Sequence, residues 1–100
     1  MTLPKDRPLA YLITTGHATD RDFVRTSSDV IASVTIAVKN GVSMVQLREK
    51  QLSGTNLYRL AAELSEIIRD SGCQLFINDR ADVAIAVGAH GVHLTSSSLP

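Results

Sequence analysis

Two cations and an amide stand at alternate positions near the middle of the chain, as Gln46, Arg48 and Lys50. In an extended strand these three side chains share one side, and the apolar Val45 and Leu47 share the other. Arginine binds phosphate as a planar fork, and lysine binds it as a point charge. The spacing therefore fits an anion site at the end of a strand. From spacing alone a solvated charge run over Arg48, Glu49 and Lys50 is the favoured alternative, since such runs are usually surface features.

A second polar pair, Asn78 and Asp79, directly follows the apolar residues 74–77. An aspartate at a strand end could hold Mg²⁺, which accepts one or two carboxylates together with waters and phosphate oxygens. Asn78 could hydrogen-bond a heteroaromatic ligand. Both residues could instead cap the helix that starts next, where Asp82 would favour the helix dipole and have a structural role.

The remaining polar residues give weaker indications of chemistry. His93 stands between Val92 and Leu94, and a lone histidine among apolar neighbours is more often a core residue than a ligand. Cys73 is the single cysteine, which predicts neither a disulfide framework nor a cysteine-based zinc site, and favours a reduced, cytoplasmic location by default. The sequence contains no Walker-type loop and no GxGxxG element.

The charge balance points away from polyanionic partners. Ten basic residues match ten acidic ones, so no overall field favours nucleic acid or an anionic membrane. Apolar stretches fall far short of the roughly 20 residues that a membrane span needs. We therefore expect small molecules rather than nucleic acids or membranes as partners.

Short apolar runs alternate with helical patterns along the whole chain, which predicts a single α/β domain over residues 1–100 with a parallel sheet. The predicted strands cover residues 9–14, 42–47, 74–77 and 91–94. The predicted helices start near residues 29, 53 and 81, and the first follows a loop over residues 15–28. Because a closed eight-stranded barrel needs about 200–250 residues, this chain could supply only half of one.

Three segments carry a family resemblance: residues 45–50 (VQLREK), 77–84 (INDRADVA) and 87–94 (VGAHGVHL). In this order and spacing they resemble successive signatures of thiamine phosphate synthases and their TenI-like relatives. The resemblance implies the N-terminal half of a (β/α)8 TIM-type barrel, with the first three βα units and the fourth strand. Such synthases join hydroxymethylpyrimidine diphosphate to a thiazole phosphate and release pyrophosphate with Mg²⁺.

The resemblance also implies roles for the polar residues. Gln46, Arg48 and Lys50 would line the pyrimidine diphosphate site, Asn78 would contact the pyrimidine, and Asp79 would ligate Mg²⁺. Cations and Mg²⁺ would then stabilise the leaving pyrophosphate as its charge develops.

The chain departs from the synthase pattern at Ser98, which stands where synthases usually carry a second aspartate ligand of Mg²⁺. A hydroxyl does not offset the charge of the metal, so we expect a lower metal affinity. Two alternatives are a TenI-like thiazole tautomerase, which the departure favours, and a non-catalytic remnant or binding half-barrel. A flavodoxin-like domain is a further alternative for the fold.

The later strands of the family, with the thiazole phosphate site, have no counterpart among these 100 residues. We therefore expect this length to be insufficient for activity. An open sheet edge should favour self-association or a partner that completes the barrel.

Overall fold

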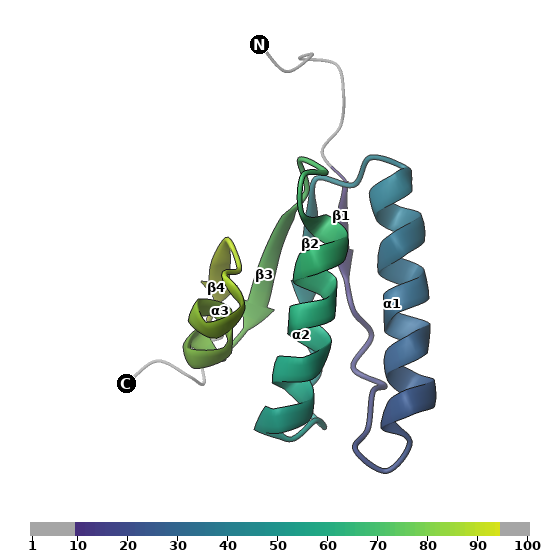
Figure 1. Cartoon of the computed structure of the whole chain (residues 1–100), viewed down its shortest axis with the longest axis vertical. Coiled ribbons are helices and arrows are strands. Elements are labelled where there is room, and N and C mark those ends of the chain that lie inside the picture. The colour runs from purple at the N-terminus through teal and green to yellow at the C-terminus, as the bar shows by residue number, and fades with distance from the viewer. Residues whose placement is uncertain (1–9, 95–100) are drawn as a thin grey trace.

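The computed structural model describes residues 10–94, in which strands and helices alternate as predicted (Figure 1). The elements are β1 (Tyr11–Ile13), α1 (Phe23–Lys39), β2 (Met44–Leu47), α2 (Gly54–Ile68), β3 (Gln74–Asn78), α3 (Ala81–Val87) and β4 (Gly91–His93). Within the described range no helix is long and apolar enough to cross a membrane.

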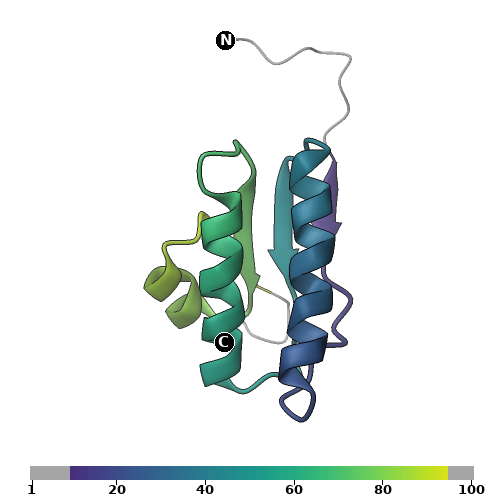
Figure 2. The same cartoon turned by 45° about the vertical axis from the view of Figure 1, so that its right-hand side comes forward.

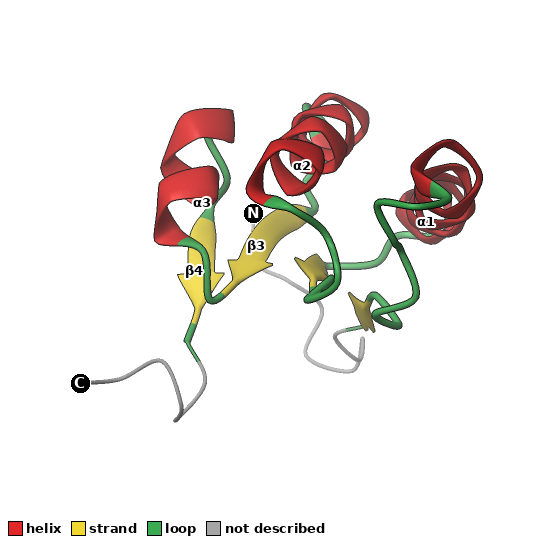
Figure 3. Cartoon of the chain, turned by 90° about the horizontal axis from the view of Figure 1, so that it is seen from below, coloured by secondary structure: helices red, strands yellow, loops and turns green. Residues whose placement is uncertain are grey.

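The four strands form one parallel sheet in the order β1-β2-β3-β4, so each strand lies beside its predecessor in the chain. All three helices lie on one face of this sheet, which curves beneath them (Figure 3). A flavodoxin-like domain has helices on both faces and the strand order 2-1-3-4-5. The observed topology excludes that alternative and is the arrangement of successive units in a β/α barrel, of which this chain forms a part.

The core lies between the sheet and the helices. On β2 and β3 the side chains of Val45, Leu47, Leu75 and Ile77 point into it and are at most 1% exposed. α1 and α2 run side by side over these strands (Figure 2). The expected alternation on β2 is therefore confirmed, because Val45 and Leu47 face the helices and Gln46 faces the other way.

The opposite face of the sheet carries no helix. There, Tyr11 and Ile13 on β1 are 58% and 50% exposed. On the same face Phe76 of β3 packs against Gly91 of β4, where an added Cβ would meet the Phe76 ring at 2.6 Å. This is the face that lines the interior of a closed barrel.

The start of α1 differs from the expectation. The helix begins at Phe23 rather than near Asp29, so the predicted loop over residues 15–28 is shorter. Hydrogen bonds of Thr26 account for the difference, because its hydroxyl donates to the Asp22 carbonyl at 2.8 Å and accepts from the Thr19 N–H at 3.1 Å. These contacts stabilise the first turn, which precedes the apolar repeat that starts at Val30.

The other helix boundaries agree with the sequence. Ser53 caps α2 as expected, since its hydroxyl accepts from the Asn56 N–H at 3.2 Å. α3 covers the predicted residues and ends at Gly88, whose φ of +69° is the left-handed conformation that glycine adopts without strain. Each strand is shorter than, or within a residue of, its predicted range.

Candidate functional site

A hydrogen-bonded row of polar side chains lies at the carboxyl ends of β2 and β3. The Gln46 amide donates from Nε2 to Asn78 Oδ1 at 3.0 Å, and Asn78 Nδ2 donates to Asp79 Oδ2 at 3.0 Å. Gln46 and Asn78 are only 7% and 6% exposed, although they face away from the helices. We call Gln46, Asn78 and Asp79 the polar row. The structure thus joins three of the predicted site residues through direct contacts.

The backbone of Asp79 takes an unusual conformation at the end of the row. Its φ is +60°, a left-handed value that aspartate tolerates better than most residues. Its N–H donates to the His93 carbonyl at 2.8 Å, which ties the end of β3 to β4. The N-cap of α3 is Arg80, whose side chain makes no capping bond. Asn78 uses its side chain in the row instead, so the capping alternative for Asn78 is wrong.

Asp82 has the structural position that the sequence predicts. It lies in the first turn of α3 and receives two hydrogen bonds from Arg80, Nε to Oδ1 at 3.0 Å and Nη2 to Oδ2 at 2.9 Å. These bonds lower the pKa of Asp82 from 3.8 to about 2. The pair fixes Arg80 beside the row.

Lys50 shares a small cavity with Asn78 and Asp79 of the polar row, whereas Arg48 does not line it. The cavity has a volume of about 250 Å³, and Lys50, Asn78 and Asp79 line it together with Glu49, Leu52, Leu57 and Arg80. Arg48 is exposed, and its backbone N–H donates to the Thr14 hydroxyl at 2.8 Å. Because β2 ends at Leu47, strand alternation does not govern the direction of either cation.

Glu49, between the two cations, is a residue that sequence reasoning missed. The solvated-run alternative is wrong for it, because it is only 4% exposed. Its two carboxylate oxygens accept from the backbone N–H groups of Gly16 at 2.9 Å and Ala18 at 2.8 Å. Bonds from N–H groups to an ionised carboxylate are among the stronger hydrogen bonds in proteins. The partners lie more than 30 residues earlier in the chain, so no local pattern reveals them.

A second carboxylate makes the reciprocal connection between the same two loops. Asp20, in the β1–α1 loop, accepts from the Ser53 N–H at 3.0 and 3.1 Å and from Asn56 Nδ2 at 2.9 Å. The Ser53 backbone bond and then the Asn56 amide lower the pKa of Asp20 below its usual 3.8. The β1–α1 loop is therefore fixed to the start of α2.

His93 is not the core residue that its neighbours suggested. It is exposed on the face without helices, and its Nδ1 lies 3.3 Å from Asn78 Oδ1. The register explains this position, since His93 on β4 pairs with Asn78 on β3. Residues paired in a parallel ladder point to the same face, so a correct register would have found the contact.

The donor set fits a magnesium ion held jointly with a ligand. Among residues 10–94 no group of three or more histidine, cysteine, aspartate or glutamate side chains could hold a metal by itself. Asp79 alone offers a hard carboxylate oxygen at the row, and Mg²⁺ commonly uses one carboxylate with waters and substrate phosphates. Ser98 lies outside the described residues.

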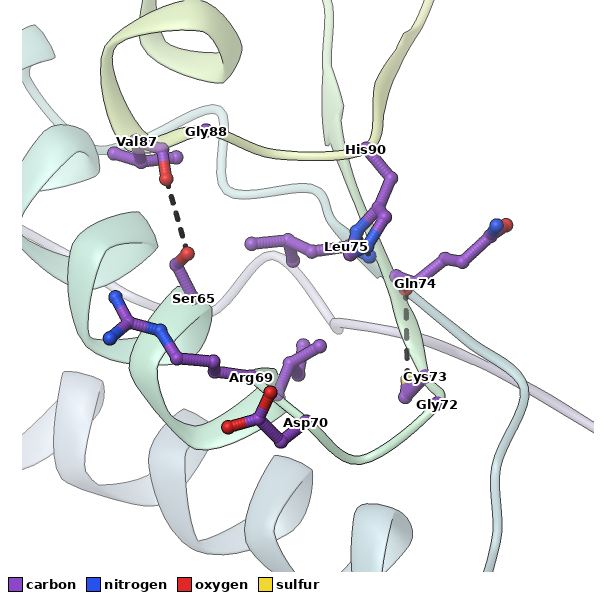
Figure 4. A pocket seen from close by; sticks show the side chains of 11 residues that line it. Ser65, Arg69, Asp70, Gly72, Cys73, Gln74, Leu75, Val87, Gly88 and His90 are labelled. Carbon is purple, nitrogen blue, oxygen red and sulfur yellow. Dashed lines mark hydrogen bonds between the residues drawn. The ribbon is translucent and has the colours of Figure 1, made fainter.

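A larger cavity of about 480 Å³ lies at the opposite end of β3, beside Cys73 and His90 (Figure 4). There His90 Nδ1 accepts from the Leu75 N–H at 2.9 Å, and the His90 N–H donates to the Leu75 carbonyl at 2.9 Å. Burial raises the pKa of the Cys73 thiol and keeps it neutral. Ligands in parallel α/β folds gather at the carboxyl ends of the strands, so the smaller cavity is the candidate site.

Comparison with known proteins places these features in one family. Residues 10–100 match the family described as thiamine monophosphate synthase. The chain belongs to this family. The predicted membership is therefore confirmed, and the polar row lies within two of the segments that first suggested it.

Curated relatives of this thiamine monophosphate synthase family member carry matching names. The chain is 46% identical over 82 residues to the thiamine-phosphate synthase of Caldanaerobacter subterraneus subsp. tengcongensis, which covers 82% of this chain and 38% of that protein. It is 40% identical over 93 residues to the putative thiamine-phosphate synthase 2 of Aquifex aeolicus, which covers 93% of this chain and 46% of the relative. The chain thus spans less than half the length of these proteins.

A solved structure confirms the fold. The thiamine phosphate pyrophosphorylase of Pyrococcus furiosus superposes with a TM-score of 0.76 at 29% identity. The match covers 92% of this chain and 41% of that one. The expected fold class, a partial barrel of the TIM type, is confirmed by this match and by the sheet topology.

Proposed function

We propose that this chain forms the pyrimidine diphosphate side of a thiamine phosphate synthase, which couples hydroxymethylpyrimidine diphosphate to a thiazole phosphate and releases pyrophosphate. The observation that carries the proposal is the polar row, with Lys50 beside it, at the carboxyl ends of two adjacent strands. Lys50, Asn78 and Asp79 line one cavity, and Gln46 is hydrogen-bonded to Asn78, so together they offer complementary partners to a heteroaromatic ring that bears a diphosphate.

In this proposal the amides bind the pyrimidine and the cations bind the diphosphate. Each amide has two N–H donors and two acceptor lone pairs, so the bonds within the row leave capacity for a ligand at Gln46 and Asn78. Arg48 and Lys50 are both exposed and can turn toward the diphosphate oxygens. When the bond to the leaving pyrophosphate breaks, its electron pair stays on the pyrophosphate oxygen, and these cations stabilise the added charge.

Asp79 is the residue that would hold Mg²⁺ in this site. The bound ion would neutralise charge on the diphosphate oxygens. Asn78 has a supporting part, because its N–H to Asp79 Oδ2 holds the carboxylate in place.

The complete activity requires more of the barrel than these residues provide. Within the described range β1 and β4 are the edges of the sheet, and each pairs with one neighbour. The chain covers 38–46% of the two curated relatives described above. We propose that further β/α units, in the same polypeptide or in a partner, pair with these edges and bring the thiazole phosphate site.

A reconstituted barrel tests the proposal. The chain would be joined to the complementary C-terminal part of the Caldanaerobacter relative and incubated with both phosphorylated precursors and Mg²⁺. We expect thiamine phosphate to form, to decrease at least tenfold with Asp79→Asn, and to persist with Asp29→Asn, which alters an exposed aspartate of α1. A folded chimera that forms no thiamine phosphate would contradict the proposal. Conversion of a thiazole tautomer without coupling would favour the tautomerase instead.

A further inference from the structure

Two loops of the candidate site are joined by a buried carboxylate. Glu49, in the β2–α2 loop, accepts from two backbone N–H groups of the β1–α1 loop through one oxygen each. One of them belongs to Gly16, which has a φ of +83° and lies beside the Arg48 carbonyl, since an added Cβ would be in van der Waals contact with that oxygen at 3.7 Å. The two loops therefore pack backbone against backbone around Glu49.

Further hydrogen bonds surround this carboxylate on both sides. The Arg48 N–H donates to the Thr14 hydroxyl at 2.8 Å, and Gln51 Nε2 donates to the Gly16 carbonyl at 2.8 Å. Residues 48, 49 and 51 are thus each hydrogen-bonded to the neighbouring loop, on both sides of Lys50. All of these contacts cross from one βα unit to the next.

The cations next to Glu49 depend on this arrangement. Arg48 and Lys50 have exposed side chains, and among residues 10–94 neither takes part in an ion pair. A long side chain loses rotamer freedom when it binds an anion, and a fixed backbone reduces the further ordering that binding requires. The Glu49 carboxylate therefore influences how the backbone orients the side chains of Arg48 and Lys50 before an anion binds.

We propose that Glu49 is a positioning residue for diphosphate binding, which holds Arg48 and Lys50 in place by tethering their backbone to residues 16–18. The identity of the anion rests on the function proposed above, whereas the tether rests on the hydrogen bonds alone. Glu49 itself touches no ligand in this account.

Electrostatics and positioning make opposite predictions for this residue. A carboxylate between two cations repels an anion, so a charge effect alone predicts tighter anion binding in Glu49→Gln. The glutamine side chain has one oxygen and one NH2 group, however, so one of the two backbone N–H groups would meet another donor. Loss of that acceptor should loosen the loop, and positioning therefore predicts weaker binding.

Titration with inorganic pyrophosphate and Mg²⁺ distinguishes the charge effect of Glu49 from its positioning effect. We expect affinity to fall by roughly tenfold in Glu49→Gln, which corresponds to one lost charge-assisted hydrogen bond. Glu63→Gln on α2 removes the same charge from an exposed position and should leave affinity unchanged. Hydrogen exchange at the Gly16, Ala18 and Arg48 amides would be measured by NMR well below the unfolding temperature. It should accelerate in Glu49→Gln and stay unchanged in Glu63→Gln.

Equal or tighter pyrophosphate binding in Glu49→Gln would overturn the positioning role. Glu49→Asp keeps the charge but is one methylene too short to reach both N–H groups, so it should also weaken binding. Unchanged binding in Glu49→Asp would count against the proposal as well. If the wild-type chain binds no pyrophosphate, the proposed function fails, and hydrogen exchange still decides the tether. Unchanged exchange in both Glu49 variants would then refute it.

Discussion

The hydrogen bonds of the polar row allow a quantitative prediction for Asn78→Asp. This substitution replaces the side-chain NH2 group by an oxygen and leaves the side-chain size nearly unchanged. The substitution removes the N–H that donates to Asp79 Oδ2 and puts a second carboxylate oxygen about 3.0 Å from it. Losing a hydrogen bond to a charged acceptor costs about 1.5–3 kcal/mol. Repulsion of unit charges at that distance adds from about 1 kcal/mol in water to about 5 kcal/mol near a protein surface.

Partial exposure of Asp79 and a stronger bond from Gln46 to the new carboxylate both reduce this cost. We therefore expect Asn78→Asp to lower the free energy of unfolding by about 2–4 kcal/mol at pH 7. Two carboxylates in contact raise the pKa of the pair in the folded state. The deficit is fully present above that raised pKa and shrinks as the pH falls through it, because a shared proton restores a donor.

Urea denaturation from pH 8 to pH 4, with and without Mg²⁺, is the assay. Asn56→Asp is the matched control, since Asn56 Nδ2 also donates to an aspartate, Asp20, at 2.9 Å, but at an exposed site. Its cost should stay below about 1 kcal/mol, partly because an acidic residue favours the first turn of α2. The reasoning would be refuted if the Asn78→Asp variant had the wild-type free energy of unfolding at pH 7. It would also be refuted if the loss of unfolding free energy grew at lower pH.

Three further outcomes follow from single contacts, and a fourth follows from the family resemblance. His90→Ala should lower the unfolding free energy by about 1–3 kcal/mol in urea titrations, because it leaves the Leu75 N–H without its acceptor, while His17→Ala at an exposed site should have little effect. Gly91→Ala should destabilise by about 1–3 kcal/mol through its clash with the Phe76 ring, and a Phe76→Ala background should remove that increment in a double-mutant cycle. The pKa of Asp82 is lowered to about 2, so this residue adds stability that is fully present above its ordinary pKa of 3.8 and is lost as the pH falls through about 2. Asp82→Asn should therefore reduce the loss of unfolding free energy between about pH 4 and pH 2. An unchanged acid dependence would show that the ion pair with Arg80 contributes nothing. Ser98→Asp, suggested by the family resemblance, should strengthen Mg²⁺-dependent pyrophosphate binding in calorimetry, and no gain would count against a metal position there.

Local sequence signals were sufficient for most of the fold. Apolar periodicity located α2, which begins after Ser53 as expected, and α3 covers its predicted residues and ends at the glycine at position 88. α1 was different, because its first turn precedes the apolar repeat and depends on hydrogen bonds of the Thr26 hydroxyl together with the packing of Phe23 against the core. The sequence of this turn resembles that of a loop, and the contacts of Thr26 with Thr19 and Asp22 distinguish the two.

The residues of the candidate site were likewise predicted only in part from the sequence. Strand ends and the resemblance indicated Gln46, Asn78 and Asp79, which the structure joins in one row. Glu49 and His93 were missed because their contacts depend on pairing between units, either across two loops or across β3 and β4. Such pairs are invisible to spacing along one segment.

Binding of hydroxymethylpyrimidine diphosphate with Mg²⁺ tests the central claim most directly. Calorimetric titration of wild type, Arg48→Ala and Arg59→Ala compares a predicted ligand-binding cation with an exposed arginine of α2. We expect wild type and Arg59→Ala to bind equally and Arg48→Ala to lose at least tenfold in affinity, as for a charge-assisted contact. Equal affinity in all three proteins, or no binding to the wild-type chain, would contradict the claim that these strand ends form a diphosphate site.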